Sequence, residues 1–468
     1  MLRVGGKERY TLNVLDWDIL QFLSLSHWAS LVGVVLFFVL LYILGHLPKK
    51  KFSFATRVLI GSGAGTLLGL LVWALSGGVS SGLSLFQPAS APEPYASDLI
   101  PWFSLVAKGY VALLACLILP MVFLASIRLV VKTPAEKTVS KLTRWKKWVN
   151  TLMLLLSAGV ALALGLVFKV GAVPDQGAPV FTADGNELVS HLSSLVPSGL
   201  GRDLVLANVA GIFVFGIYVG IAARRMQAKS DSVKSLIDIL DGAFSVGVSV
   251  CKTVIAYKPM GAGAIMAWLV ASCGPVILLM IAKMLLALIL GMAVMLVLQT
   301  LLCALSGVSP AAFWGKGKPV MVKALKTRSG SGCLPDAQQV LAEGLGLRRE
   351  ITDPVAAYAI ASGAQGCAAL FPTLSVLFAL GLFGTSMTPG LIAAHLILVV
   401  IVSYGITELP GTATMSELGL VMGLGASEAL PGLGAMIAID PIADVFRTLI
   451  NVTGCMTNAI IVERRVKE

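Results

Sequence analysis

A run of charged and polar side chains interrupts the last apolar segment of the chain, at spacings of four, three, one, three and four residues. Residues at such spacings share one face of a helix. An ionised side chain at the centre of a bilayer costs roughly 2.5 to 3.5 kcal/mol, so this face must pair its charges or meet a polar ligand. The face consists of Asp440, Asp444, Arg447, Thr448, Asn451 and Cys455.

Two of these charges complement an amino-acid zwitterion. Arg447 can hold a carboxylate through its planar fork of donors, and Asp444 can accept an α-ammonium. The alternative is an ion pair between Asp444 and Arg447 that only holds helices together. The Thr and Asn on the same face, together with two interrupted apolar segments described below, favour the binding site.

The composition is that of a chain dissolved in lipid. Of 468 residues, 57% are hydrophobic and 13% are charged, and the mean hydropathy is +0.89. Such a chain is too apolar for a water-soluble fold, so we expect an all-α integral membrane protein. No phosphate-binding loop, GxSxG or HExxH motif occurs, which disfavours ATP drive and hydrolysis. Seven Cys without CxxC spacing predict neither disulfides nor a metal site, and we expect no cofactor.

The net charge of +11 does not indicate nucleic acid, because Lys and Arg gather in short loops between apolar runs, where they fix topology. We expect these clusters in the cytoplasm of a bacterium, the N-terminus in the periplasm and the C-terminus in the cytoplasm, with the chain in the inner membrane. The clusters are Lys49 to Lys51, Lys132 to Lys147, Arg224 to Lys234, Lys316 to Arg328 and Arg464 to Lys467.

About nine transmembrane helices are predicted, because a helix needs about 20 apolar residues to cross a bilayer. They cover residues 30–47, 57–78, 102–131, 148–172, 205–224, 234–267, 271–304, 351–382 and 431–463.

Two further segments are predicted to be re-entrant helical hairpins. Residues 319–340 are too polar and broken for a span, and residues 399–422 carry Gly, Glu and Pro at their middle. Non-helical backbone at membrane depth is tolerated only where it is buried in protein or lines a wet cavity. Each hairpin precedes one long helix, and this duplication is typical of transporters built from inverted repeats.

Several motifs resemble the dicarboxylate/amino acid:cation symporter family, the group of glutamate/aspartate transporter homologues. TRSGSGCLP (327–335), LPGTATM (409–415) and the segment beginning DPIADVFRTLINVTG (440–454) resemble its first hairpin, second hairpin and last helix. The resemblance extends from residue 52 to the C-terminus. An extra helix at the N-terminus and GCAALFP (366–372) are most similar to the bacterial L-cystine uptake branch.

The resemblance implies a homotrimer in which a transport unit slides across the membrane against a rigid scaffold, as an elevator. It assigns residues 1–51 to the extra helix, 52–235 to the scaffold and first transport helices, 236–308 to connecting helices and 309–468 to the core transport domain. Arg328 and Asp440 would support the substrate site from behind. By position that site is lined by Ser329, Gly330, Ser331, Gln365, Cys367, Leu409, Pro410, Gly411, Asp444, Arg447, Thr448 and Asn451.

The chain departs from its sodium-coupled relatives where they bind the ion. Gly363 to Cys367 replaces their Asn-Met-Asp-Gly-Thr, and Cys455 replaces an Asp. A Tyr and a Thr of their third helix correspond to Met153 and Leu156, which leaves Ser157. Hard cations need several oxygen ligands. We therefore expect at least two of the family's sodium sites to be missing.

The coupling cation is expected to be a proton, or one sodium ion held by backbone carbonyls of residues 403–407. Glu408, at the tip of the second hairpin, is the candidate proton carrier, because burial favours the neutral form of a carboxylate. A solvated gate residue is the alternative for Glu408. Gly363, Asn451 and Cys455 are the other coupling-ion candidates.

The sequence thus predicts a secondary active amino-acid transporter, with L-cystine as the favoured substrate and membrane lipid as its surroundings. Uptake of another amino acid or of a dicarboxylate, such as glutamate or aspartate, is the alternative on the same frame. Two alternatives belong to other classes of protein: a passive solute or anion channel, and a membrane sensor that transports nothing.

Overall fold

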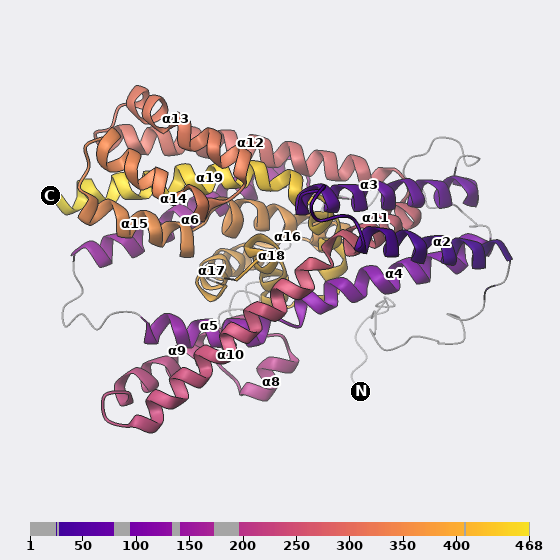
Figure 1. The fold of residues 1–468 in the computed structure, drawn as a ribbon, viewed down its shortest axis with the longest axis horizontal. Helices are drawn as coiled ribbons and strands as arrows, with labels where there is room; N and C mark the ends of the chain where they lie inside the picture. Colours follow the sequence, from indigo (N-terminus) through magenta and orange to yellow (C-terminus); the bar gives the residue numbers. More distant parts are fainter. Residues whose placement is uncertain are drawn as a thin grey trace.

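The computed structural model describes Leu25 and residues 28–78, 94–132, 141–172, 196–406 and 409–467. Every regular element within these ranges is a helix, and the helices form one elongated bundle (Figure 1). In chain order the elements are α2 (Trp28–Gly45), α3 (Phe54–Trp73), η1 (Ala74–Gly78), α4 (Pro94–Ala115), α5 (Ile118–Val131), α6 (Lys141–Val167), α8 (Leu200–Val205), α9 (Val209–Met226), α10 (Asp231–Ala256), α11 (Lys258–Cys273), α12 (Val276–Leu305), α13 (Pro310–Thr327), α14 (Gly330–Gln339), η2 (Val340–Gly344), α15 (Arg349–Ser362), η3 (Gln365–Leu370), α16 (Phe371–Leu382), α17 (Pro389–Gly405), α18 (Thr412–Gly423), η4 (Ser427–Gly432) and α19 (Leu433–Lys467).

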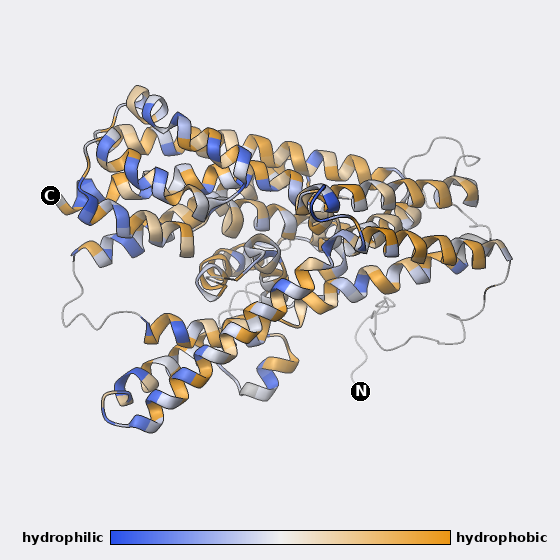
Figure 2. Ribbon diagram, viewed as in Figure 1, coloured by the Kyte–Doolittle hydropathy of each residue, from blue (hydrophilic) through white to orange (hydrophobic). Residues whose placement is uncertain are grey.

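Nine helical stretches of the described residues are long and apolar enough to cross a membrane, which confirms the all-α membrane class. Figure 2 shows apolar residues along most of the bundle, with hydrophilic residues gathered near the C-terminus and at the turn between α9 and α10. The nine are Trp28–Gly45, Phe54–Ser76, Asp98–Val131, Lys141–Val167, Val209–Met226, Asp231–Ala256, Val276–Leu305, Arg349–Leu382 and Ser427–Val466.

Three helices that the sequence predicts as continuous are broken. The helix expected at residues 102–131 divides at Cys116 and Leu117 into α4 and α5. The helix expected at residues 234–267 divides at Tyr257 into the largely exposed α10 and the buried α11, which carries Pro259 in its first turn. Proline has no N–H to donate and fits the first turn of a new helix. The helix expected at 351–382 divides at Gly363 into α15, the π-helical turn η3 and α16.

Gly363 lies at the break between α15 and η3. A Cβ at this position would lie 1.8 Å from Oδ1 of Asn150 on α6, so the amide of Asn150 fills the space that a side chain at position 363 would need. The next residue, Ala364, has ψ of 88°, which is incompatible with a continuous α-helix.

Both predicted hairpins are helix–turn–helix units, but each begins about ten residues earlier than expected. The first comprises α13, a turn at Arg328 and Ser329, and α14, which continues into η2. The second comprises α17 and α18. Their first arms start alike: Ser309 and Thr388 each cap the helix by accepting a backbone N–H, and a Pro follows at once. The two hairpins therefore begin with the same capping motif, a Ser or Thr followed by Pro, and the apolar pattern alone does not reveal this repeat.

The described elements fall into packed groups. Helix α11 packs on α3 and α4, and α5 packs on α9. Helix α19 is the axis of the largest group and contacts α6, α12, α13, α15 and η3, and it also packs on α11. The α17–α18 hairpin lies in the middle of Figure 1, with α18 against α16 and α17 against α5.

The contact between α3 and α11 depends on glycine. Gly61, Gly65 and Gly69 recur every fourth residue along α3 and are buried. A Cβ on Gly65 would lie 2.0 Å from the carbonyl oxygen of Gly263 on α11. Small residues at this spacing let membrane helices approach backbone to backbone.

We predict that Gly65→Ala lowers the free energy of unfolding by about 1–3 kcal/mol, because the new methyl group separates α3 from α11. Gly63→Ala is the control, since nothing lies within 4 Å of a Cβ there. Thermal unfolding of the purified protein in detergent measures both. Equal melting temperatures for the two variants would contradict this packing.

Candidate functional site

The residues of the polar face of α19 lie on one side of the helix, as their spacing predicts, and Asp444 and Arg447 form the ion pair that was the alternative to a binding site. Arg447 is only 5% exposed. Its Nε donates to Oδ1 of Asp444 at 3.2 Å, and its Nη2 lies 3.0 Å from the same oxygen. Nη2 also forms an ion pair with Asp440, which lies one turn before Asp444. The hydroxyl of Thr448 lies 3.4 Å from Oδ1 of Asp444. Two carboxylates of the same helix therefore hold the guanidinium in place.

One donor nitrogen of this guanidinium is left over. Nη1 of Arg447 is buried and has no hydrogen-bond partner among the described residues. The guanidinium lies 4.9 Å from the centre of the Phe371 ring, so one of its faces is also covered. A buried donor without a partner costs about 1–3 kcal/mol, and more when it is charged. An anionic group placed at Nη1 would remove this cost.

Asp440 links the polar face of α19 to α11, the helix that packs on α3 and α4. It forms an ion pair with Lys258, the first residue of α11, as well as with Arg447. Lys258 is 4% exposed, and its ammonium also donates to the hydroxyl of Thr414 on α18 at 3.3 Å. The sequence reasoning named Asp440 but missed Lys258. The sequence does indicate a role for Lys258, because a single Lys inside the apolar segment YKPMGAGAIM needs a carboxylate to pair with.

The turn η3 is fastened to α19 by Asn451. Its Oδ1 accepts from the backbone N–H groups of Gly366 at 2.7 Å and Cys367 at 3.2 Å, and its Nδ2 lies 2.9 Å from the Cys367 sulfur. A Cβ on Gly366 would lie 2.3 Å from the carbonyl oxygen of Arg447. Arg447, Asn451 and Cys367, all predicted site residues, are thus brought together.

Gln365 takes part in a different network, further along α19. Its Oε1 accepts from Gln299 at 2.9 Å and its Nε2 donates to Asn458 at 3.3 Å. Asn458 in turn donates to Asn150 at 3.2 Å. Ser157 donates to the backbone carbonyl of Gln365 at 2.9 Å. The structure places Gln365 in this buried amide network, away from the carboxylates around Arg447.

The two hairpin tips are placed differently. At the first tip, Arg328 has a left-handed backbone and donates to the carbonyl of Pro441 at 3.4 Å, which ties the tip to α19. Ser329 caps α14 by accepting from Gly332, and its hydroxyl lies 3.5 Å from that of Ser331. Gly330 is the first residue of α14.

At the second tip, Leu409 is buried and its carbonyl accepts from the Thr412 hydroxyl at 3.1 Å. Pro410 is half-buried, and Gly411 has a left-handed backbone and caps α18. A Cβ on Gly411 would lie 2.9 Å from Ile255 of α10, so this tip packs on α10. Glu408, the predicted proton carrier, lies outside the described residues.

The remaining coupling-ion candidates present few oxygens. The thiol of Cys455 is buried and donates to the carbonyl of Val452 at 3.1 Å. Gly363 has no side chain and packs on Asn150. Ser403 donates to the carbonyl of Ser362 at 2.7 Å, beside the break.

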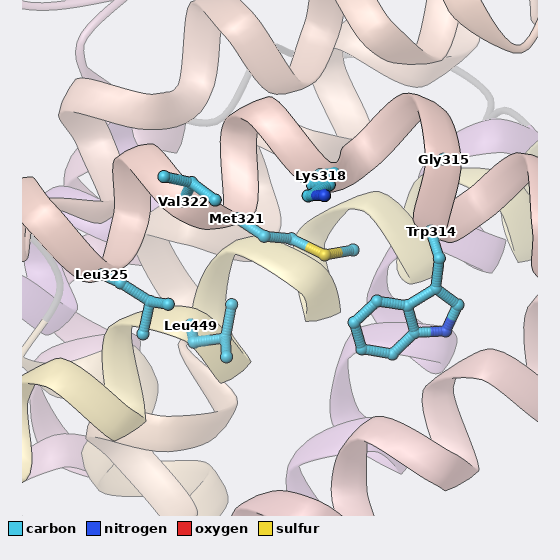
Figure 3. Close-up of a pocket in the computed structure, with 7 residues that line it drawn as sticks. All are labelled: Trp314, Gly315, Lys318, Met321, Val322, Leu325 and Leu449. Atoms are coloured by element: carbon cyan, nitrogen blue, oxygen red, sulfur yellow. The ribbon is translucent and has the colours of Figure 1, made fainter.

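Figure 3 shows a cavity of about 430 Å³ between α13 and α19, away from the charged face. Apolar side chains dominate its lining, with Lys318 at its edge, so it offers no partner for an α-ammonium. Its lining residues are Trp314, Gly315, Lys318, Met321, Val322, Leu325 and Leu449.

The described part of the chain holds nine long apolar helical stretches, two helical hairpins and broken helices around buried charges, and these are the features of a multi-pass membrane transporter. The chain matches the Sodium:dicarboxylate symporter family over residues 54–465 and belongs to it. It is therefore a cation-coupled symporter and not an enzyme.

Similar proteins carry a more specific name. The chain is 25% identical to the L-cystine uptake protein TcyP of Bacillus cereus over 92% of its own length and 93% of that protein's. It is 24% identical to TcyP of Bacillus licheniformis, with coverages of 93% and 95%. TcyP of Shouchella clausii is 25% identical, with coverages of 89% and 90%.

We predict that Lys258→Met lowers the free energy of unfolding by about 3–5 kcal/mol, because it removes one partner from a buried ion pair. Asp440→Asn added to Lys258→Met should cost less than the sum of the two single changes, with a coupling energy of about 0.5–3 kcal/mol. Thermal unfolding of the four proteins measures this cycle. Lys252→Met, at an exposed position on α10, is the control. Additive costs would show that Lys258 and Asp440 do not interact.

Proposed function

We propose that this protein imports an amino acid, with L-cystine as the favoured substrate, across the bacterial inner membrane by secondary active transport. The observation that carries the proposal is the unpartnered Nη1 of Arg447, held next to Asp444 at a buried position. The guanidinium supplies a charge-assisted donor for a carboxylate, and Asp444 supplies an acceptor for an ammonium group.

Three features support L-cystine. The chain is similar to TcyP proteins over nearly its whole length. L-cystine has two carboxylates and two ammonium groups, so it can use separate anchors at its two ends. Arg447 would hold one carboxylate and Asp444 one ammonium group. The backbone N–H groups at Ser329, Gly330 and Ser331, at the start of α14, would hold a second carboxylate.

The proposed motion is an elevator within a homotrimer. The moving unit would consist of the core transport domain, residues 309–468, with α6 and α12, because these two helices pack on η3 and α16 as well as on α19. The scaffold would contain α3, α4, α5, α9, α10 and α11. The N-terminus would lie in the periplasm and the C-terminus in the cytoplasm. On this division the pair of Lys258 and Asp440 crosses the boundary between scaffold and moving unit.

A dicarboxylate or acidic amino acid is the second candidate substrate. The name of the family supports it, and the same Nη1 donor could hold a side-chain carboxylate. The coupling cation would be a proton, or a single sodium ion near Ser403, since Cys455 and Gly363 contribute no oxygen ligand from a side chain.

Counterflow tests the proposed function. Proteoliposomes loaded with unlabelled L-cystine should take up labelled L-cystine without an ion gradient, because a carrier exchanges substrate one molecule for another. A passive channel gives no such transient accumulation. Adding unlabelled L-glutamate or L-aspartate and measuring how far each reduces the uptake of labelled L-cystine tests the second candidate substrate. Exchange of either acidic amino acid with no exchange of L-cystine would contradict the favoured substrate.

We predict that Arg447→Lys weakens L-cystine binding by roughly 10- to 100-fold, because Lys keeps the charge but lacks the planar fork of donors. Cys455→Ala is the matched control on the same helix and should change binding less than threefold. Ligand-induced shifts of the melting temperature over a range of L-cystine concentrations measure both. Wild-type affinity in Arg447→Lys would remove Arg447 from the substrate site.

A further inference from the structure

A buried carboxylate on α18 takes no part in the ion pairs around Arg447. Glu417 lies on α18, in the second arm of the second hairpin, and its residue is 0% exposed. Both of its carboxylate oxygens are buried without a hydrogen-bond partner among the described residues. The hydroxyl of Ser375 on α16 is close to this carboxylate, but it donates to the carbonyl of Phe371 at 3.0 Å. An ionised carboxylate in such surroundings is costly.

Glu417 belongs to the same cluster as the predicted substrate site. It is close enough to interact electrostatically with Asp440 and Arg447 of α19 and with Lys258 of α11. Thr414, which accepts from Lys258, precedes it by three residues and so shares its face of α18.

Among the titratable groups on the helices packed around α18, Arg128 of α5 pairs with Asp241, and Lys108 of α4 lies over the ring of Trp268. Tyr110 of α4 faces Asp440. His395 of α17 is paired with Thr373 at 2.9 Å. Cys367 of η3 lies beside Arg447 and Asp444. None of the last three groups carries a positive charge that could balance Glu417.

The charges of the cluster balance without Glu417. Lys258 and Arg447 are two cations, and Asp440 and Asp444 are two anions joined to them by ion pairs. An ionised Glu417 would leave one uncompensated negative charge at a buried position, and a zwitterionic substrate would not change that sum. A single proton on Glu417 makes the occupied site neutral.

We propose that Glu417 is the proton-binding site that couples transport to the proton gradient, in place of Glu408. The inference rests on the proposed function, because it names the coupling ion of that site. Glu417 takes up one proton on the acidic side, becoming a neutral carboxylic acid, and releases it on the other side. One proton then crosses the membrane with each zwitterionic substrate.

The experiment uses the full-length protein in proteoliposomes, with the membrane potential clamped near zero. With the outside one pH unit more acidic, the wild type should accumulate labelled L-cystine about tenfold for one coupled proton. Glu417→Gln, a neutral mimic of the protonated acid, should lose accumulation while keeping counterflow within about threefold of the wild type. Glu428→Gln, at an exposed Glu eleven residues further on, and Glu408→Gln should both still accumulate substrate.

Each outcome separates the two proposals. Tenfold accumulation by Glu417→Gln, or accumulation by the wild type only under a sodium gradient, would overturn the role of Glu417 and leave L-cystine transport standing. If Glu417→Gln does not fold, Glu417→Met provides another neutral side chain of similar volume.

A readout that needs no substrate covers the case in which the wild type does not carry L-cystine. The infrared carbonyl band of a protonated carboxylic acid should be present in the wild type and in Glu428→Gln, and lost in Glu417→Gln. An unchanged band in Glu417→Gln would overturn the inference whatever the substrate proves to be.

Discussion

Buried charges inside the membrane helices have to be neutralised, and this requirement governs how the helices around α19 are arranged. Arg447 lies inside a membrane helix, where an isolated cation is costly, and Asp440 and Asp444 of the same helix compensate it. Lys258 comes from α11 to pair with Asp440 as well. The cluster is charge-balanced but keeps one open donor on Arg447. Structural stability and readiness for a ligand therefore come from the same few side chains.

The backbone is broken where it has to approach this cluster. Gly363 and Gly366 flank the point at which α15 ends and η3 begins. At each of them a neighbouring residue lies where a Cβ atom would be, so neither position has room for a side chain. The freed N–H groups of Gly366 and Cys367 are accepted by Asn451, one turn beyond Arg447. Breaking the helix thus costs no hydrogen bond at this point, since a side chain of α19 satisfies the groups that the break exposes.

Sequence patterns predicted most of the fold and the charged face of α19, because apolar runs of about 20 residues and intramembrane charges are strong signals. They failed at Leu117, Tyr257 and Gly363, where helices break inside continuous apolar runs and hydropathy does not change. They also missed Lys258 and Glu417. Each is a single charged residue in an apolar segment, and its partners lie on helices distant in sequence, so that only the fold reveals what surrounds it.

In the proposed substrate complex, a substrate carboxylate fills the place beside Nη1 of Arg447. A structure of the protein determined by electron cryomicroscopy with saturating L-cystine tests it most directly. We expect substrate density with a carboxylate within hydrogen-bonding distance of Nη1 and an ammonium group next to Asp444. Density for L-cystine elsewhere, with Nη1 still unpartnered, would contradict it.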